Sequence, residues 1–152
     1  FVSGRKLDDD ANILLRMSEN VKGSLSVSQI ATGEENNLAF SIYGEQGAIH
    51  WSQENPNYGK LSKIDKRDQI ITRGTFSETN SMSYIRVPPG HPEGYLEGFA
   101  QIYSDIADII NNSQNSNNLL KIIPDEEVGM HIMNFISACV ESSKNNSKWI
   151  KL

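Results

Sequence analysis

The sequence has little that would mark a membrane protein, a secreted protein or a nucleic-acid-binding protein. No apolar run approaches the roughly 20 residues that cross a bilayer, and the N-terminus carries no secretory signal pattern. There is no basic run, and 14 Lys and Arg residues against 19 Asp and Glu residues give a formal net charge of -5. Such a charge opposes a phosphate backbone at long range. We therefore expect no membrane partner and no nucleic-acid partner.

Cysteine is almost absent. The single Cys139 cannot form a disulfide within the chain, which favours a reducing compartment, and we expect a cytoplasmic location. Cys139 also lies on an apolar helical stripe, where a buried structural thiol is more common than a nucleophile.

Motifs for cofactor binding and catalysis are missing as well. No Gly-x-Gly-x-x-Gly follows a strand-like segment, and no nucleophile, base and acid can be assembled with specificity. Glu127 and His131 are four residues apart, but a metal-dependent hydrolase built on them would have an incomplete ligand set. The sequence therefore predicts no catalytic, cofactor-binding or metal-binding residue in this chain.

What is present fits one globular domain. The chain has 152 residues, of which 38% are hydrophobic and 22% are charged, an ordinary balance for a chain that folds around one core. It begins at Phe1 rather than at methionine, so we expect a fragment of a longer protein.

The first half of the chain alternates apolar and polar residues with period 2. This pattern predicts one hairpin over residues 11–27 and a second over residues 38–53. Gly44 and Gly47 flank the second turn and are able to take positive φ. Further short strands are predicted at residues 60–65, 69–73, 83–87 and 148–152.

Three small side chains, Ser24, Ser26 and Ser28, line one side of the second strand of the first hairpin. Two interpretations are open. The stripe is either a solvent-exposed face or a flat contact surface, since small side chains let another sheet approach closely.

Helical spacing begins after a Pro-Pro-Gly sequence. Apolar residues recur over residues 95–110, and Pro92 and Glu93 suit the first turn of a helix. The polar tract 111–118 predicts a mobile surface loop, and a second helix is predicted to start near Asp125. Strands followed by helices predict an α+β fold: an open, mostly antiparallel β-sheet with two main helices on one face.

His91 has the most informative position of the three histidines. It stands between Gly90 and Pro92, directly before the first predicted helix, where an imidazole can project past unsatisfied backbone N–H groups. This position suits a hydroxyl-rich or anionic ligand. The alternative is a histidine that only helps to start the helix.

Several short motifs occur in a characteristic order. The most distinctive is Pro89-Gly90-His91-Pro92-Glu93-Gly94-Tyr95, running into Phe99 and Tyr103. The others are Asp8-Asp9-Asp10-Ala11, Val27-Ser28-Gln29, Ile42-Tyr43-Gly44, Pro124-Asp125, Gly129-Met130 and Lys148-Trp149-Ile150. In order and spacing they resemble the C-terminal domain of the glucose-fructose oxidoreductase / inositol dehydrogenase (Gfo/Idh/MocA) family over nearly the whole chain.

The resemblance implies a division of labour between two domains. In that family an N-terminal Rossmann domain holds NAD or NADP, and hydride is transferred to or from a sugar, cyclitol or related polyol. Residues 1–152 would be a single C-terminal domain for substrate contact and for homo-oligomerisation through the open sheet face, with the Rossmann domain absent from the chain. The family's catalytic Glu-Lys-Pro and Asp-x-x-x-His patterns do not occur here.

The fragment alone is therefore expected neither to catalyse nor to bind the cofactor. By the same resemblance His91, with Glu93 and Tyr95 beside it, would line the polyol pocket. The alternative is a stand-alone ligand-binding or protein-interaction module without enzymatic activity.

Overall fold

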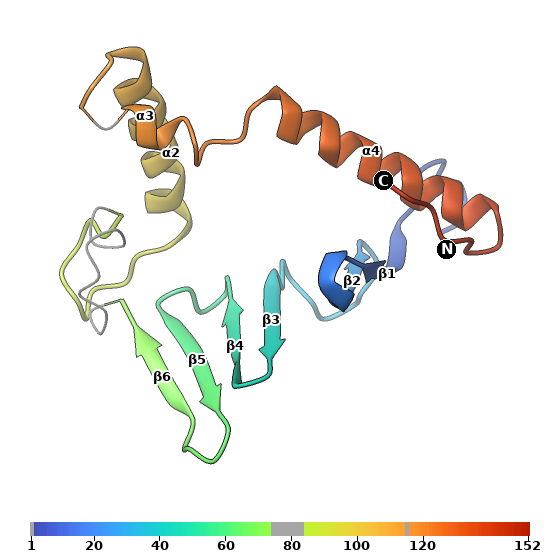
Figure 1. The fold of residues 1–152 in the computed structure, drawn as a ribbon, viewed down its shortest axis with the longest axis horizontal. Helices are drawn as coiled ribbons and strands as arrows, with labels where there is room; N and C mark the ends of the chain where they lie inside the picture. Colours follow the sequence, from blue (N-terminus) through green and yellow to red (C-terminus); the bar gives the residue numbers. More distant parts are fainter. Residues whose placement is uncertain (1, 74–83, 115) are drawn as a thin grey trace. The chain divides into compact units, whose positions relative to one another are not determined.

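The computed structural model describes residues 2–73, 84–114 and 116–152. They form two compact units, residues 1–34 with 123–152 and residues 35–122. Figure 1 shows the elements of both in chain order.

The first unit contains the predicted first hairpin. Strands β1 (Asp10–Arg16) and β2 (Lys22–Ser28) pair antiparallel, and a short 3-10 helix, η1 (Ser18–Asn20), makes the connection. Glu19 and Asn20 take positive φ values of 57° and 63° there, a conformation that polar residues in tight turns tolerate. The alternation of apolar residues thus predicted this hairpin correctly.

The second predicted helix is also present, as α4 (Glu126–Lys144). Asp125 caps it, because its Oδ1 accepts a hydrogen bond of 3.0 Å from the backbone N–H of Val128. Acidic residues in the first turn and Lys144 in the last turn match the helix dipole.

The strand predicted at residues 148–152 is wrong, since these residues form no regular element. The Arg16 guanidinium instead lies 4.3 Å from the ring centroid of Trp149. A cation–π contact with β1 thus takes the place of ladder pairing at the chain end.

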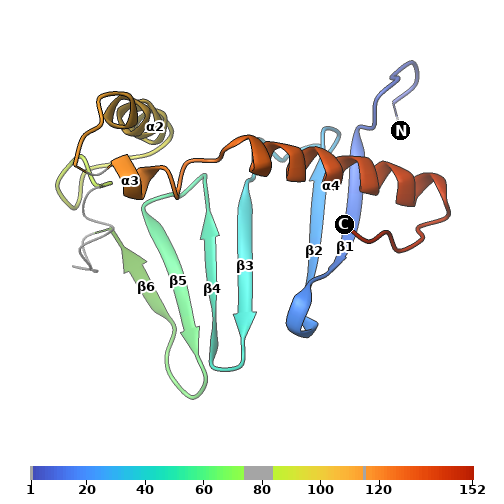
Figure 2. The same cartoon turned by 45° about the horizontal axis from the view of Figure 1, so that its top comes forward.

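The second unit holds a four-stranded antiparallel sheet in the order β3-β4-β5-β6. Its strands are β3 (Ala39–Gly44), β4 (Gly47–Ser52), β5 (Tyr58–Lys63) and β6 (Gln69–Thr72), seen side by side in Figure 2. These strands and the helices of both units confirm the predicted α+β class. The predicted sheet is divided into two sheets, one in each unit.

The second predicted hairpin is present as β3 and β4, but the glycines of its turn do not use the left-handed region that is open to them. Neither Gly44 nor Gly47 has positive φ. Gly47 is needed for space instead, because a Cβ there would lie 2.2 Å from the backbone oxygen of Ser62 on β5. The strands β4 and β5 approach too closely at this point for a side chain.

The register gives the four-stranded sheet two different faces. One face carries the apolar side chains Phe40, Ile42, Ile49, Trp51, Leu61 and Ile71. The opposite face carries mostly polar ones, among them Ser41, His50, Ser52, Lys60 and Ser62. On the apolar face the ring centroids of Phe40 and Trp51 are 5.7 Å apart, and Arg73 follows β6 directly.

No strand forms at 84–87, the described part of the strand predicted at residues 83–87. Ser83 lies outside the described residues. The backbone N–H of Arg86 donates to the Glu93 carboxylate, at 2.8 Å. The Glu93 carboxylate thus binds the backbone N–H of Arg86, which would otherwise be free to donate to a neighbouring strand.

The first predicted helix is α2 (Tyr95–Ile110), and it begins later than expected. Pro92 and Glu93 lie outside it, because Glu93 is held by partners elsewhere in the unit and Gly94 is the N-cap.

Within the polar tract 111–118, which was predicted to be a loop, a short helix α3 (Ser116–Leu119) begins and contacts α2. Leu119 is the last residue of this helix and is only 2% exposed.

None of the helices within the described part of the chain combines the length and hydrophobicity that crossing a membrane requires.

Candidate functional site

The segment before α2, residues 86–94, carries His91 and Glu93, and Tyr95, the third residue predicted to contact a substrate, is the first residue of the helix. The segment turns at Gly90, whose φ of +88° is accessible mainly to glycine. The backbone N–H of His91 donates to the carbonyl of Pro88 at 3.2 Å and closes the turn. The sequence therefore builds a tight bend that places His91 just ahead of the helix.

Arg73, at the end of β6, binds this segment at several points. Its Nη1 donates to the Glu93 carboxylate and to the Val87 carbonyl, the latter at 3.4 Å. Its Nη2 donates to the carbonyl of His91, and its Nε donates to Asn57 Oδ1 at 2.8 Å. The planar guanidinium has five N–H donors in a fixed fork, so one side chain can fix four acceptors at once.

Glu93 is the acidic partner of this arrangement. One carboxylate oxygen binds Arg73, and the other accepts from the backbone N–H of Arg86 at 2.8 Å. Its own backbone N–H donates to Asn57 Oδ1 at 3.2 Å. The ion pair is largely shielded from water, with side-chain exposures of 18% for Arg73 and 8% for Glu93. Charges removed from water in this way need hydrogen-bond partners, and here both carboxylate oxygens and four of the five guanidinium N–H groups have one.

Arg86 extends the same network to α2. Its Nη2 donates to Gln101 Oε1 at 2.9 Å and to Ser104 Oγ at 3.0 Å. The segment before α2 is thus tied both to the end of β6 and to the side of the helix that follows it.

The start of α2 is stabilised by its own N-terminal turn. The backbone N–H of Gly94 donates to Glu97 Oε2 at 2.9 Å, which is half of a capping box. This hydrogen bond is the main reason why the pKa of Glu97 lies below its ordinary value.

The His91 ring has a defined hydrogen-bond partner. Its Nδ1 lies 3.2 Å from the carbonyl oxygen of Pro88. A carbonyl only accepts, so this contact is a hydrogen bond in the tautomer that carries the proton on Nδ1, and in that tautomer Nε2 is a hydrogen-bond acceptor. The side chain is exposed. Its chemistry therefore suits accepting a hydrogen bond from a ligand hydroxyl.

The three predicted site residues have different surroundings in the structure. His91 is exposed, and Tyr95 is 65% exposed with its ring centroid 4.8 Å from that of Phe99. Glu93 holds the segment through Arg73, and its direct contact with a substrate stays a prediction, as do those of His91 and Tyr95.

The sequence analysis missed Arg73, Asn57 and Arg86. Arg73 and Glu93 are 20 residues apart, and Asn57 and Glu93 are 36 apart, so no local spacing rule joins them. One signal was available: a charged residue directly after the apolar alternation of a strand is a candidate partner for a buried carboxylate.

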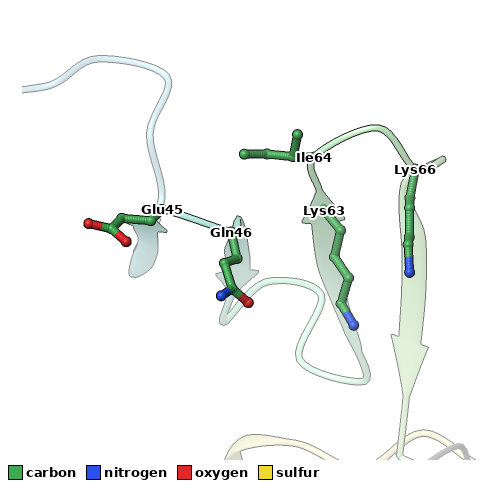
Figure 3. Close-up of a pocket in the computed structure, with 5 residues that line it drawn as sticks. All are labelled: Glu45, Gln46, Lys63, Ile64 and Lys66. Atoms are coloured by element: carbon green, nitrogen blue, oxygen red, sulfur yellow. The ribbon is translucent and has the colours of Figure 1, made fainter.

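Two hollows lie elsewhere in the second unit. The first, of about 370 Å³, lies between the β3–β4 and β5–β6 turns and is lined by Glu45, Gln46, Lys63, Ile64 and Lys66. Figure 3 shows both lysine side chains running in one direction and the Glu45 carboxylate pointing away from them.

The other hollow, of about 380 Å³, is lined by residues of all four strands of the sheet and includes His50 and Lys60. Neither hollow is lined by His91, Glu93 or Tyr95. Within residues 2–73, 84–114 and 116–152, no three His, Cys, Asp or Glu side chains are grouped so that they could hold a metal ion.

Comparison with known proteins gives consistent matches along the chain. Residues 2–152 match the family described as "Oxidoreductase family, C-terminal alpha/beta domain". The chain is 27% identical over 158 residues to the uncharacterized oxidoreductase YfiI of Bacillus subtilis, covering 99% of this chain and 40% of that protein.

Solved structures give the same result. An oxidoreductase from Sinorhizobium meliloti is 42% identical with a TM-score of 0.92, over 99% of this chain and 43% of that one. An inositol dehydrogenase homologue from Azotobacter vinelandii, complexed with NAD+, is 22% identical with a TM-score of 0.88, over 97% of this chain and 39% of that one. At 22% identity this last likeness shows the fold. The chain spans about two fifths of each of these relatives.

Proposed function

Because the chain belongs to the Gfo/Idh/MocA oxidoreductase family as its C-terminal alpha/beta domain, we propose that it forms the substrate side of an NAD(P)-dependent enzyme acting on a sugar, cyclitol or related polyol. The observation that carries the proposal is the segment before α2, which Arg73 holds in place. In this segment the exposed His91 ring can accept a hydrogen bond from a ligand hydroxyl. A structural neighbour from Azotobacter vinelandii, an inositol dehydrogenase homologue, is complexed with NADH and myo-inositol, which supports a cyclitol or polyol as the substrate class.

The residues described in this chain do not fit a dinucleotide cradle. Such a cradle needs parallel strands joined through a Gly-rich turn and a helix, whereas the strand pairs described here are antiparallel. We assign NAD or NADP binding to a separate N-terminal Rossmann domain. Relatives about two and a half times as long as this chain support that assignment.

In this proposal the three site residues have different tasks. His91 accepts a hydrogen bond from a substrate hydroxyl through Nε2, and Tyr95 offers a phenolic hydroxyl beside it. Glu93 contributes mainly by holding the segment in place through Arg73. The chain orients the polyol, and the proton and hydride steps belong to the domain that carries the nicotinamide.

The first experiment tests the division between two domains. The reading frame upstream of Phe1 is expected to encode a strand, a Gly-rich turn and a helix within about 150 to 200 codons. Calorimetric titration with NAD+ is expected to show binding to the two-domain protein and none to the 152-residue chain. Micromolar binding by the chain alone would refute the assignment, and a start codon at this position would favour a stand-alone binding module.

The second experiment tests His91 in the two-domain protein. His91→Ala is expected to raise KM for myo-inositol about 3- to 10-fold, the range for one lost hydrogen bond, while the NAD+ affinity stays the same. His131→Ala, at an exposed position of α4, is the matched control. Equal kinetics for both variants would return His91 to the role of a residue that only starts the helix.

We also propose that the chain forms homo-oligomers through an open sheet face and works in the cytoplasm. Ser24 and Ser26 are exposed on β2. Their partners across the hairpin, Leu14 and Asn12 of β1, lie on the same face of the sheet. Light scattering of the double variant Ser24→Arg/Ser26→Arg is expected to show smaller particles than the unmodified protein. A monomer at high concentration, or no change on substitution, contradicts this surface.

A further inference from the structure

Arg73 and His91 come from different parts of the second unit and meet at one backbone carbonyl. Arg73 follows β6, and its Nη2 donates to the carbonyl oxygen of His91 itself. The same guanidinium holds the carbonyl of Val87 and the carboxylate of Glu93, so it binds the residue before Pro88 and the second residue after His91. The turn that contains His91 is therefore fixed at both ends by one side chain.

The two hydrogen bonds of the Pro88 carbonyl depend on the shape of this turn. The carbonyl accepts from both the backbone N–H and the ring Nδ1 of His91, each at 3.2 Å. These bonds need the backbone of residues 88–91 in its present bend, with Gly90 at φ +88°. If the turn opens, the ring loses the acceptor that selects its protonated nitrogen.

We propose that Arg73 is a positioning residue for substrate recognition: by clamping the turn at Val87, His91 and Glu93, it keeps the His91 ring in the Nδ1–H form with Nε2 as acceptor for a substrate hydroxyl. This inference rests on the function proposed above for His91. It adds that the recognising form of the ring is selected by a residue that itself touches no substrate.

Lysine cannot replace arginine in this role. Its ammonium group is a point charge without a planar fork, so it can keep the ion pair with Glu93 but cannot also hold Asn57, Val87 and His91 in their present directions. Arg73→Lys therefore separates charge from geometry. Arg67→Lys, at an exposed position between β5 and β6, is the matched control.

The first test needs no substrate. Nitrogen-15 NMR of histidine-labelled full chain, recorded with the imidazoles neutral, distinguishes the two tautomers, and loss of a signal in His91→Ala assigns that residue. His91 is expected in the Nδ1–H form in the unmodified and Arg67→Lys chains and in a mixture in Arg73→Lys, because a solvated ring without a fixed acceptor populates both forms. An Nε2–H ring in the unmodified chain, or unchanged signals in Arg73→Lys, overturns the proposal.

The second test uses the two-domain protein with NAD+ and myo-inositol as the probe. Arg73→Lys is expected to raise KM for myo-inositol about 3- to 10-fold and to leave the affinity for NAD+ unchanged. In the His91→Ala background the same substitution is expected to add less than about 2-fold, since its effect passes through His91. Full additivity of the two substitutions contradicts the positioning role.

The two tests separate this inference from the proposed function. If His91→Ala leaves KM unchanged while Arg73→Lys still alters the tautomer, the substrate role of His91 fails and the control of its ring by Arg73 stands. If His91→Ala raises KM while Arg73→Lys changes neither KM nor the tautomer, the proposed function stands and the positioning role fails.

Discussion

The ion pair between Arg73 and Glu93 gives the sharpest stability prediction. Replacing Glu93 with Gln removes the negative charge but keeps a side chain of the same size. With side-chain exposures of 18% and 8%, the remaining guanidinium is largely shielded from water and loses its counter-charge. We expect the free energy of unfolding of the chain to fall by about 3 kcal/mol, the lower end of the range for breaking a buried pair from one side.

The assay is urea denaturation at neutral pH, in which a lower midpoint with an unchanged slope reports a loss of stability alone. The double variant Arg73→Met/Glu93→Met removes both charges. Its free energy of unfolding is expected to fall by less than the sum of the losses in Arg73→Met and Glu93→Met, because neither charge is left without its partner. Asp68→Asn is the control, because the pair of Asp68 with Lys60 is about half exposed on both sides, at 50% and 46%. A Glu93→Gln loss below about 1 kcal/mol, the range of exposed pairs, would refute the reasoning.

Four other substitutions test three features of the fold. Gly47→Ala is expected to destabilise the fold by about 1–3 kcal/mol through overpacking, since its Cβ would lie 2.2 Å from the backbone oxygen of Ser62. Gly98 in α2 has open space around it, so Gly98→Ala is expected to stabilise the fold by a few tenths to about 1 kcal/mol. Asp125→Ala should cost about 1 kcal/mol through the lost N-cap. The lowered pKa of Glu97 stabilises the fold at neutral pH, and this contribution should disappear as the pH falls below the ordinary carboxyl value of about 4.3.

Thermal unfolding followed by circular dichroism measures all three. Equal effects of the two glycine substitutions would contradict the account of the β4–β5 approach, and an unchanged Asp125→Ala variant would contradict the cap. For Glu97, the unmodified chain should lose more stability than Glu97→Gln between about pH 5 and pH 3. Parallel curves for the two proteins would contradict the assigned hydrogen bond.

Local patterns predicted the elements that depend on local physics. Alternating apolar residues gave both hairpins, and helical spacing with Asp125 as cap gave α4. The start of α2 was placed too early because the dipole rule allows Glu93 in a first turn, whereas in the fold Glu93 pairs with Arg73, 20 residues away.

The residues of the candidate site also differ in whether their role depends on sequence neighbours or on distant parts of the chain. His91 could be selected as a candidate because it stands between Gly90 and Pro92 in the sequence, and its role in binding stays a prediction. Arg73 and Asn57 could not be selected in this way, because their roles arise only when the sheet brings the end of β6 and the start of β5 beside the segment before α2. The strand predicted at 148–152 is absent, and the described contact of Trp149 is with the Arg16 guanidinium, a partner 133 positions away that no local pattern indicates.

Asn57, Arg73 and Glu93 have a further consequence as a set of three. Asn57 Oδ1 accepts from Arg73 Nε, Arg73 Nη1 donates to the Glu93 carboxylate, and the Glu93 N–H returns to the same Asn57 oxygen. The contacts form a closed triangle among three chain segments, so cutting any one side leaves all three segments joined through the other two. Freeing any one of the three residues requires two of these contacts to break at once. The Glu93 amide should therefore be among the slowest to exchange with deuterium outside the strands and helices.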